Sequence, residues 1–190
     1  MATTIKICGI RDEGLARVAH NLGADFLGLV LTASRRQITL EQAKAIIDAV
    51  PEGQFVAVGR DVDEPLFEEM LALNVKAVQL HGRVPTRWIA RAHGVGKWAI
   101  ATMLEVQADI VLLDGVVPGS GVARTWEKPE FTRPIWIAGG LSVDNVRAVV
   151  RRLRPDGVDV SSGVEKEGRK DPELIRRFIQ EVQYGDNASA

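Results

Sequence analysis

Residues 135–165 read IWIAGGLSVDNVRAVVRRLRPDGVDVSSGVE, and this stretch contains one complete unit of the predicted fold. Two short apolar runs, 135–138 and 157–160, have the composition of β-strands. Between them, apolar residues recur every three to four positions from Val143 to Leu153, which predicts a helix with one buried face. A strand, a helix and a second strand in this order predict a βαβ unit with parallel strands.

The same alternation of strands and helices extends over the whole chain. Eight strand-like runs are predicted, at Thr4–Cys8, Phe26–Leu31, Gln54–Val58, Val75–Leu80, Lys97–Ala101, Ile110–Leu113, Ile135–Ala138 and Gly157–Val160. Most of them are continuously apolar, so both faces of the sheet are expected to be covered, as in parallel sheets flanked by helices. An open doubly wound sheet and a closed (βα)8 barrel both satisfy this pattern. The eight candidates favour the barrel, which is the α/β architecture known as the TIM barrel.

Helix boundaries and loop lengths refine this prediction. Thr39 with Gln42 indicates a capping box, Ser142 is the expected N-cap of the helix inside 135–165, and Asp171 before Pro172 marks the start of the last helix. Only Thr102 to Asp109 separate the fifth and sixth strands, so we expect a compact barrel with a shortened fifth crossover.

Composition limits the classes of protein that this chain can belong to. Its 190 residues fit one domain, predicted as a barrel at 1–184 with a polar, frayed C-terminal tail at 185–190. A balance of 24 Lys and Arg against 25 Asp and Glu predicts no general attraction to nucleic acid or to an anionic membrane. A single cysteine and no zinc-like Cys/His spacing indicate a reducing compartment, hence the cytoplasm, and no metal site. No apolar run reaches the length of a signal peptide or membrane helix, so we expect a soluble, unprocessed protein.

Candidate catalytic residues lie where predicted strands end. Cys8 ends the first strand, Asp114 follows the sixth, His81 ends the fourth, and Arg36 lies in the loop after the second, with Arg35 beside it. Each has an ordinary structural explanation: a packed thiol, a loop carboxylate, a solvated guanidinium or a core imidazole. In a barrel, however, the carboxyl ends of all strands surround one pocket. Their joint placement favours a small-molecule active site.

Glycine-rich turns after the last two strands indicate an anion site. Gly139-Gly140 and Ser161-Ser162-Gly163 let the backbone approach a ligand closely, and the loops after the seventh and eighth strands of barrel enzymes commonly hold phosphate. A third segment, Gly119-Ser120-Gly121 within 115–126, is either a mobile lid or a flexible connector.

Together these motifs resemble those of the phosphoribosylanthranilate isomerase family, (βα)8 enzymes of tryptophan biosynthesis. The resemblance spans nearly the whole chain and rests on KICGIR at Lys6–Arg11, GADFLGLVL at Gly23–Leu31, SRRQI at Ser34–Ile38, VQLHG at Val78–Gly82, LLD at Leu112–Asp114, GSG with Trp126, AGGL with Asn145-Val146, and VDVSSGVE with Gly168-Arg169-Lys170-Asp171.

The resemblance implies an Amadori rearrangement of N-(5-phosphoribosyl)anthranilate to 1-(2-carboxyphenylamino)-1-deoxyribulose 5-phosphate, with no metal or organic cofactor. Asp114 matches the family's general acid, which protonates the furanose ring oxygen, and Cys8 matches the general base, which removes the proton from sugar carbon 2. We therefore expect burial to raise the pKa of Asp114, and nearby donors or cations to lower the pKa of Cys8.

The resemblance also implies roles in binding and a small-molecule phosphoribosyl ligand as the partner. Arg36 would face the anthranilate carboxylate and Asp159 the sugar hydroxyls, while His81 is either a ligand contact or a core histidine. The phosphate would be held by Gly139, Gly140, Ser161, Ser162 and Gly163. A monomer or weak homodimer is expected.

The chain departs from the family pattern at two places near the pocket mouth. Gly59 and the pair Arg124-Thr125 stand where the family usually has a phenylalanine and Phe-Asp. Because loss of aromatic contacts there would alter the aglycone accepted, an isomerase of another phosphoribosyl amine remains an alternative. A non-catalytic phosphate-ligand binding protein is a second alternative, which the presence of Cys8 and Asp114 disfavours.

Overall fold

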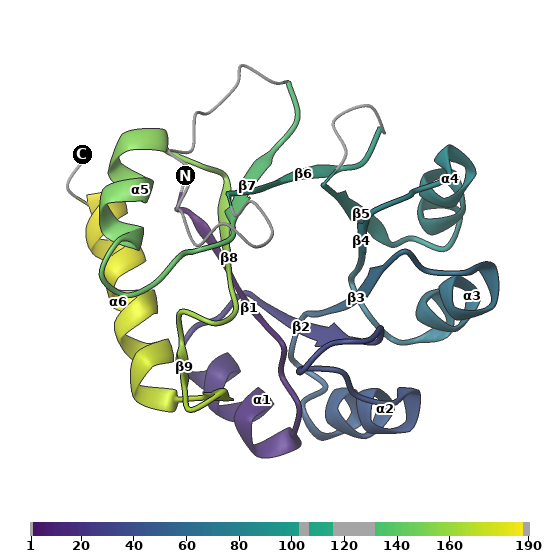
Figure 1. The fold of residues 1–190 in the computed structure, drawn as a ribbon, viewed down its shortest axis with the longest axis horizontal. Helices are drawn as coiled ribbons and strands as arrows, with labels where there is room; N and C mark the ends of the chain where they lie inside the picture. The colour runs from purple at the N-terminus through teal and green to yellow at the C-terminus, as the bar shows by residue number, and fades with distance from the viewer. Residues whose placement is uncertain (1, 103–106, 116–131, 188–190) are drawn as a thin grey trace.

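The computed structural model describes residues 2–102, 107–115 and 132–187. Its parallel strands β1 to β8 pair in sequence order, and β8 returns to β1 in a register from Thr4↔Gly157 to Ile7↔Val160, which closes the barrel. Figure 1 looks into the ring of strands, with helices arranged around its outside. The predicted closed barrel is therefore confirmed.

The observed strands agree closely with the predicted ones. Their bounds are β1 (Thr4–Cys8), β2 (Phe26–Val30), β3 (Phe55–Arg60), β4 (Ala77–His81), β5 (Trp98–Ala101), β6 (Ile110–Asp114), β7 (Ile135–Ala138) and β8 (Gly157–Val160). β1, β7 and β8 have the predicted ends, and the others differ by one or two residues. A short hairpin of β9 (Glu165–Lys166) and β10 (Arg169–Lys170) follows β8. Continuous apolar runs thus mark strands covered on both faces.

The described helices are α1 (Glu13–Asn21), α2 (Leu40–Ala49), α3 (Glu64–Ala72), α4 (Thr86–Gly94), α5 (Val146–Leu153) and α6 (Pro172–Asn187). The capping box of α2 is confirmed, since Gln42 N–H donates to Thr39 Oγ1 at 3.2 Å and Thr39 N–H donates to Gln42 Oε1 at 2.8 Å. The N-cap prediction at Ser142 is wrong. Asn145 caps α5, and its side chain instead accepts from Ser142 N–H at 2.9 Å.

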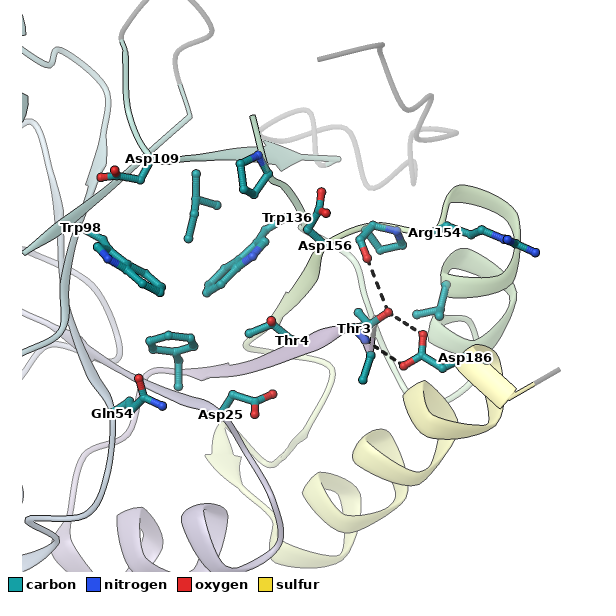
Figure 2. Close-up of a pocket in the computed structure, with 17 residues that line it drawn as sticks. Thr3, Thr4, Asp25, Gln54, Trp98, Asp109, Trp136, Arg154, Asp156 and Asp186 are labelled. Atoms are coloured by element: carbon teal, nitrogen blue, oxygen red, sulfur yellow. Dashed lines mark hydrogen bonds between the residues drawn. The ribbon is translucent and has the colours of Figure 1, made fainter. Parts of the chain in front are cut away.

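The C-terminal boundary also differs from the prediction. Residue 185 was expected to begin a frayed tail, but α6 continues to Asn187 and Gly185 is buried against Val150. Asp186 accepts hydrogen bonds from the N–H and hydroxyl of Thr3 at 2.9 and 2.7 Å (Figure 2). Polar composition gave no sign of this contact, because Thr3 lies at the opposite end of the chain. Residues 188–190 lie outside the described residues.

The shortened fifth crossover stays a prediction. Only residues 102–109 separate β5 from β6, and 103–106 among them lie outside the described residues. Within the part of the chain that the structure describes, no helix is long and apolar enough to cross a membrane.

Figure 2 shows the end of the barrel where the strands begin, and its polar side chains stabilise the strand starts. Asp25, Asp109 and Asp156 each directly precede a strand, and each accepts from a backbone N–H near the start of the preceding strand at 2.7 to 2.8 Å. Inside the ring, Phe26 packs against Trp136 with ring centroids 5.4 Å apart. These carboxylates stabilise the strand starts, so the hollow of about 900 Å³ on this face is not where we place the chemistry.

Candidate active site

A smaller cavity, of about 270 Å³, opens at the carboxyl ends of the strands. The predicted catalytic and binding residues that line it are Cys8, Arg36, His81, Asp114, Gly139, Gly140, Asp159, Ser161 and Ser162. They come from β1, β4, β6 and β8 and from the loops after β2, β7 and β8. Closure of the barrel therefore brings together residues that are far apart in the sequence.

Gly163 is a predicted site residue that does not line this cavity. Its backbone instead pairs with Ser142, which joins the loop after β8 to the loop after β7. A Cβ atom at residue 163 would lie 1.8 Å from the carbonyl oxygen of Leu141. Glycine is needed here because the two loops touch through their backbones. Gly163 thus holds the two predicted phosphate loops in contact.

The two glycines after β7 adopt backbone conformations that other residues rarely take. Gly139 has φ of 73° and Gly140 has φ of 68°. The following turn is tied down by Asn145, whose side-chain amide donates to the carbonyl oxygen of Gly140 at 2.8 Å. Gly139 and Gly140 therefore form the part of the cavity wall that lies between β7 and the start of α5.

A buried ion pair lies beneath the cavity. Lys6 is completely buried inside the barrel, and its Nζ donates to both carboxylate oxygens of Asp159 at 2.9 Å. Burial opposes the charge on Lys6, but Asp159 and Cys8 together outweigh burial and raise the pKa of Lys6. Sequence reasoning missed Lys6 and related Asp159 only to the sugar. The sequence feature that could have identified Lys6 is a lysine within an apolar strand. It lies two residues before Cys8 and therefore on the same face of the strand.

Cys8 lies next to this ion pair. A Cβ atom at Gly28 would be 2.8 Å from Cys8 Sγ and 3.1 Å from Lys6 Nζ. Both atoms therefore pack against the backbone of Gly28, where no side chain intervenes. Burial raises the pKa of the Cys8 thiol, although the adjacent Lys6 acts to lower it. The predicted lowering of this pKa is therefore wrong in direction, because desolvation of a thiolate outweighs the neighbouring ammonium.

Asp114 and His81 approach the cavity from neighbouring parts of the ring. Asp114 is exposed with respect to the residues that the structure describes, which contradicts the expected burial of its carboxyl. Burial lowers the pKa of His81, so its imidazole is neutral at neutral pH. His81 Nε2 lies 2.8 Å from Gln79 Nε2, which also donates to Asp159 at 3.4 Å. His81 is thus both hydrogen-bonded and accessible to a ligand. Sequence reasoning missed Gln79.

Arg36 is held in place by residues that follow β8. Its Nε and Nη2 donate to the two carboxylate oxygens of Glu165 at 2.6 and 2.8 Å. Arg36 and Lys170 stabilise the charged carboxylate and lower the pKa of Glu165 to about 2. Lys170 also donates to the carbonyl oxygen of Ser161 at 3.1 Å. Sequence reasoning placed Arg36 correctly in the cavity but missed these two supporting residues.

The departure at Gly59 has a different meaning from the one expected. A Cβ atom there would lie 2.3 Å from Val62 Cγ2 and 3.5 Å from Met70 Sδ, in the layer between β3 and α3. A phenylalanine at residue 59 would therefore not point into the mouth, and its absence removes no aromatic contact from the cavity. The departure at Arg124-Thr125, the Gly119–Gly121 segment and Trp126 lie outside the described residues.

Comparisons with known proteins agree with this site. Residues 5–181 match the family described as N-(5'phosphoribosyl)anthranilate (PRA) isomerase. The N-(5'-phosphoribosyl)anthranilate isomerase of Streptococcus pneumoniae (strain Hungary19A-6) is 37% identical over 96% of this chain and 97% of its own. The crystal structure of the Thermus thermophilus phosphoribosyl anthranilate isomerase has a TM-score of 0.78 and 33% identity, covering 95% of this chain and 98% of that one.

A further solved structure contains a ligand. It is a phosphoribosyl anthranilate isomerase in complex with reduced 1-(o-carboxyphenylamino)-1-deoxyribulose 5-phosphate, with a TM-score of 0.76 and 27% identity over 95% of this chain and 98% of that one. The matches in sequence and in structure both extend over nearly the whole barrel. This chain therefore belongs to the N-(5'-phosphoribosyl)anthranilate isomerase family.

Proposed function

We propose that this chain converts N-(5-phosphoribosyl)anthranilate to 1-(2-carboxyphenylamino)-1-deoxyribulose 5-phosphate in tryptophan biosynthesis, with Asp114 as general acid and Cys8 as general base. The observation that carries the proposal is the meeting of these two groups, from β6 and β1, around one cavity that also has the glycine turn after β7 on its wall. Membership of the family supports the reaction, and the geometry supports these two roles.

Ring opening is the step that we assign to Asp114. Its proton passes to the furanose ring oxygen as the bond from that oxygen to carbon 1 breaks, while the nitrogen lone pair forms the protonated imine. This step needs the neutral carboxyl. A substrate seated over the barrel would cover Asp114, which is otherwise exposed.

Proton abstraction is the step that we assign to Cys8. The thiolate removes the proton from carbon 2, the electron pair moves to the carbon 1–carbon 2 bond, and the imine nitrogen becomes neutral. The resulting enol then loses its hydroxyl proton and gains a proton at carbon 1, which gives the aminoketose. The imine nitrogen accepts the electrons, so the chemistry needs no cofactor.

We assign the two ends of the substrate to different groups of residues around the mouth. We assign the phosphate to Gly139, Gly140, Ser161 and Ser162, with Gly163 joining their loops. Arg36 would bind the carboxylate through donors that Glu165 leaves available, since a guanidinium has five N–H groups. Asp159 and His81 would contact the sugar, because each retains capacity for a further hydrogen bond.

Expression of this chain is expected to restore growth without tryptophan in a cell that lacks this isomerase. The same gene with Cys8→Ala serves as the control and is expected to give no growth. Purified protein should form the aminoketose from N-(5-phosphoribosyl)anthranilate, followed by chromatography. Failure of both growth and product formation would contradict the proposed substrate.

Inorganic phosphate is expected to inhibit competitively by occupying the loops after β7 and β8, because backbone amides at such turns bind anions. Gly140→Leu should weaken this inhibition, since φ of 68° is unfavourable for leucine and Gly140 lines the cavity. Gly96→Leu is the matched control, because Gly96 has φ of 72° in open space. Inhibition constants from steady-state kinetics test this. Equal constants in all three proteins would place the phosphate elsewhere.

We also propose a cytoplasmic monomer or weak homodimer. The large apolar side chains that are exposed in the described part of the chain are Val18, Val95, Trp98 and Tyr184, which lie on different elements. Isolated exposed apolar residues are ordinary for a monomer surface. Light scattering after gel filtration, at several protein concentrations, measures the state directly.

A further inference from the structure

β3 ends in an arginine that sequence reasoning did not identify. Val56 and Val58 face the interior of the barrel, and Arg60, two residues further on, lies on the same side of the strand. Arg60 is exposed and lines the same cavity as Arg36 and His81. Its guanidinium therefore belongs to the mouth of the active site, not to the outer surface of the barrel.

The guanidinium of Arg60 has no hydrogen-bond or ion-pair partner among the residues that the structure describes. Its backbone N–H donates to Thr32 Oγ1 at 2.9 Å, which fixes the end of the strand. The neighbouring carboxylate of Asp61 is engaged elsewhere, since it packs against Gly82 and accepts from Arg83 N–H at 3.1 Å. Arg36, by contrast, gives two donors to Glu165. Arg60 is thus the more available cation for an anionic ligand.

The position of β3 in the ring indicates which part of a ligand Arg60 would meet. In a closed barrel of eight strands in sequence order, β3 lies four strands from β7 and therefore opposite the loops assigned to phosphate. Its neighbours are β4, where Arg60 is paired with the neutral His81, and β2. Arg36 follows β2 and its side chain lies over Gly9, on the wall of the same cavity. A substrate anchored by its phosphate on β7 and β8 would extend its aglycone towards this side.

We propose that Arg60 is a specificity-determining residue that binds the carboxylate of the aglycone together with Arg36. This inference rests on the proposed function. Two donors of Arg36 are committed to Glu165, so a carboxylate with several acceptor sites has room for a second guanidinium, which can bind it with two parallel N–H···O bonds. The departure of this chain from the family pattern at the end of β3 would then supply a charged contact instead of removing an aromatic one.

The test compares Arg60→Gln with Arg83→Gln, a matched control that removes an exposed arginine which does not line the cavity. Two probes are the amines formed by reducing the imines of ribose 5-phosphate with anthranilate and with aniline, which differ only in the ring carboxylate. Dissociation constants are measured by calorimetry at constant ionic strength, and kcat and KM are measured with N-(5-phosphoribosyl)anthranilate.

In Arg60→Gln we expect binding of the carboxylate probe to weaken by about tenfold, binding of the aniline probe to change by less than about twofold, and KM to rise more than kcat falls. Arg83→Gln should leave both dissociation constants, KM and kcat close to those of the unchanged protein. Equal weakening of both probes would overturn the proposal, since Arg60 would then act as a general attraction for phosphate. Unchanged binding of both would overturn it too. If the unchanged protein neither binds the carboxylate probe nor turns over the substrate, the proposed function itself fails.

Discussion

Replacing Cys8 by alanine is expected to lower kcat by at least ~10²-fold while the barrel stays folded, because the variant loses the group that removes the proton from carbon 2. Asp114→Asn should cause a loss of similar size, since an amide does not donate the proton needed for ring opening. Both side chains lie at the carboxyl ends of strands, where substitutions alter the chemistry more than the packing. Binding of the reduced anthranilate amine should largely survive in both variants.

Steady-state kinetics, calorimetry with that amine and circular dichroism test this prediction together. Near-normal turnover in a folded variant would remove the role assigned to that residue. The pH profile gives a further check on Cys8: burial raises its pKa, so the reactive thiolate is the minority form at neutral pH. We therefore expect kcat/KM to increase as the pH rises through the alkaline range towards that pKa. A profile that falls over this range would contradict Cys8 as the base.

Replacing Lys6 by methionine is expected to destabilise the protein by about 3–5 kcal/mol, because it leaves the carboxylate of Asp159 buried without its partner. The side chains of Lys6 and Asp159 are 0% and 6% exposed, so solvent does little to compensate. The double variant Lys6→Met, Asp159→Leu is the control, and it should recover much of the lost stability since no buried charge remains. Urea unfolding of the wild type and of both variants measures the differences.

The same variants separate a structural role of Lys6 from its effect on Cys8. Lys6 acts to lower the pKa of the neighbouring thiol, so Lys6→Met should slow alkylation of Cys8 by iodoacetamide at neutral pH, even in molecules that remain folded. Because the pKa of Lys6 is raised in the folded state, the contribution of its charge to stability is present at neutral pH and is lost as the pH rises through that raised pKa. A double variant no more stable than Lys6→Met would contradict the buried-charge explanation.

The sequence was sufficient for the order and nearly the bounds of the strands, and for most of the candidate site. An apolar run, a helical period and a capping box are properties of neighbouring residues, so they can be recognised without knowing the fold. Cys8 and Asp114 were identifiable for a related reason. Once a barrel is predicted, any polar residue at the end of a strand is placed on its active-site face. The family resemblance then supplied the reaction that these residues carry out.

Only the tertiary structure decided which distant residues act on one another. Lys6 and Asp159 are 153 positions apart, Arg36 and Glu165 129, and Thr3 and Asp186 183. Each pair exists because the closed ring brings segments near the start of the chain beside segments near its end, and no local pattern specifies which side chains then meet. The pKa of Cys8 could not be predicted for the same reason. Its direction depends on the balance between burial of the thiol and a neighbouring ammonium group, and that balance is created when the barrel closes around both.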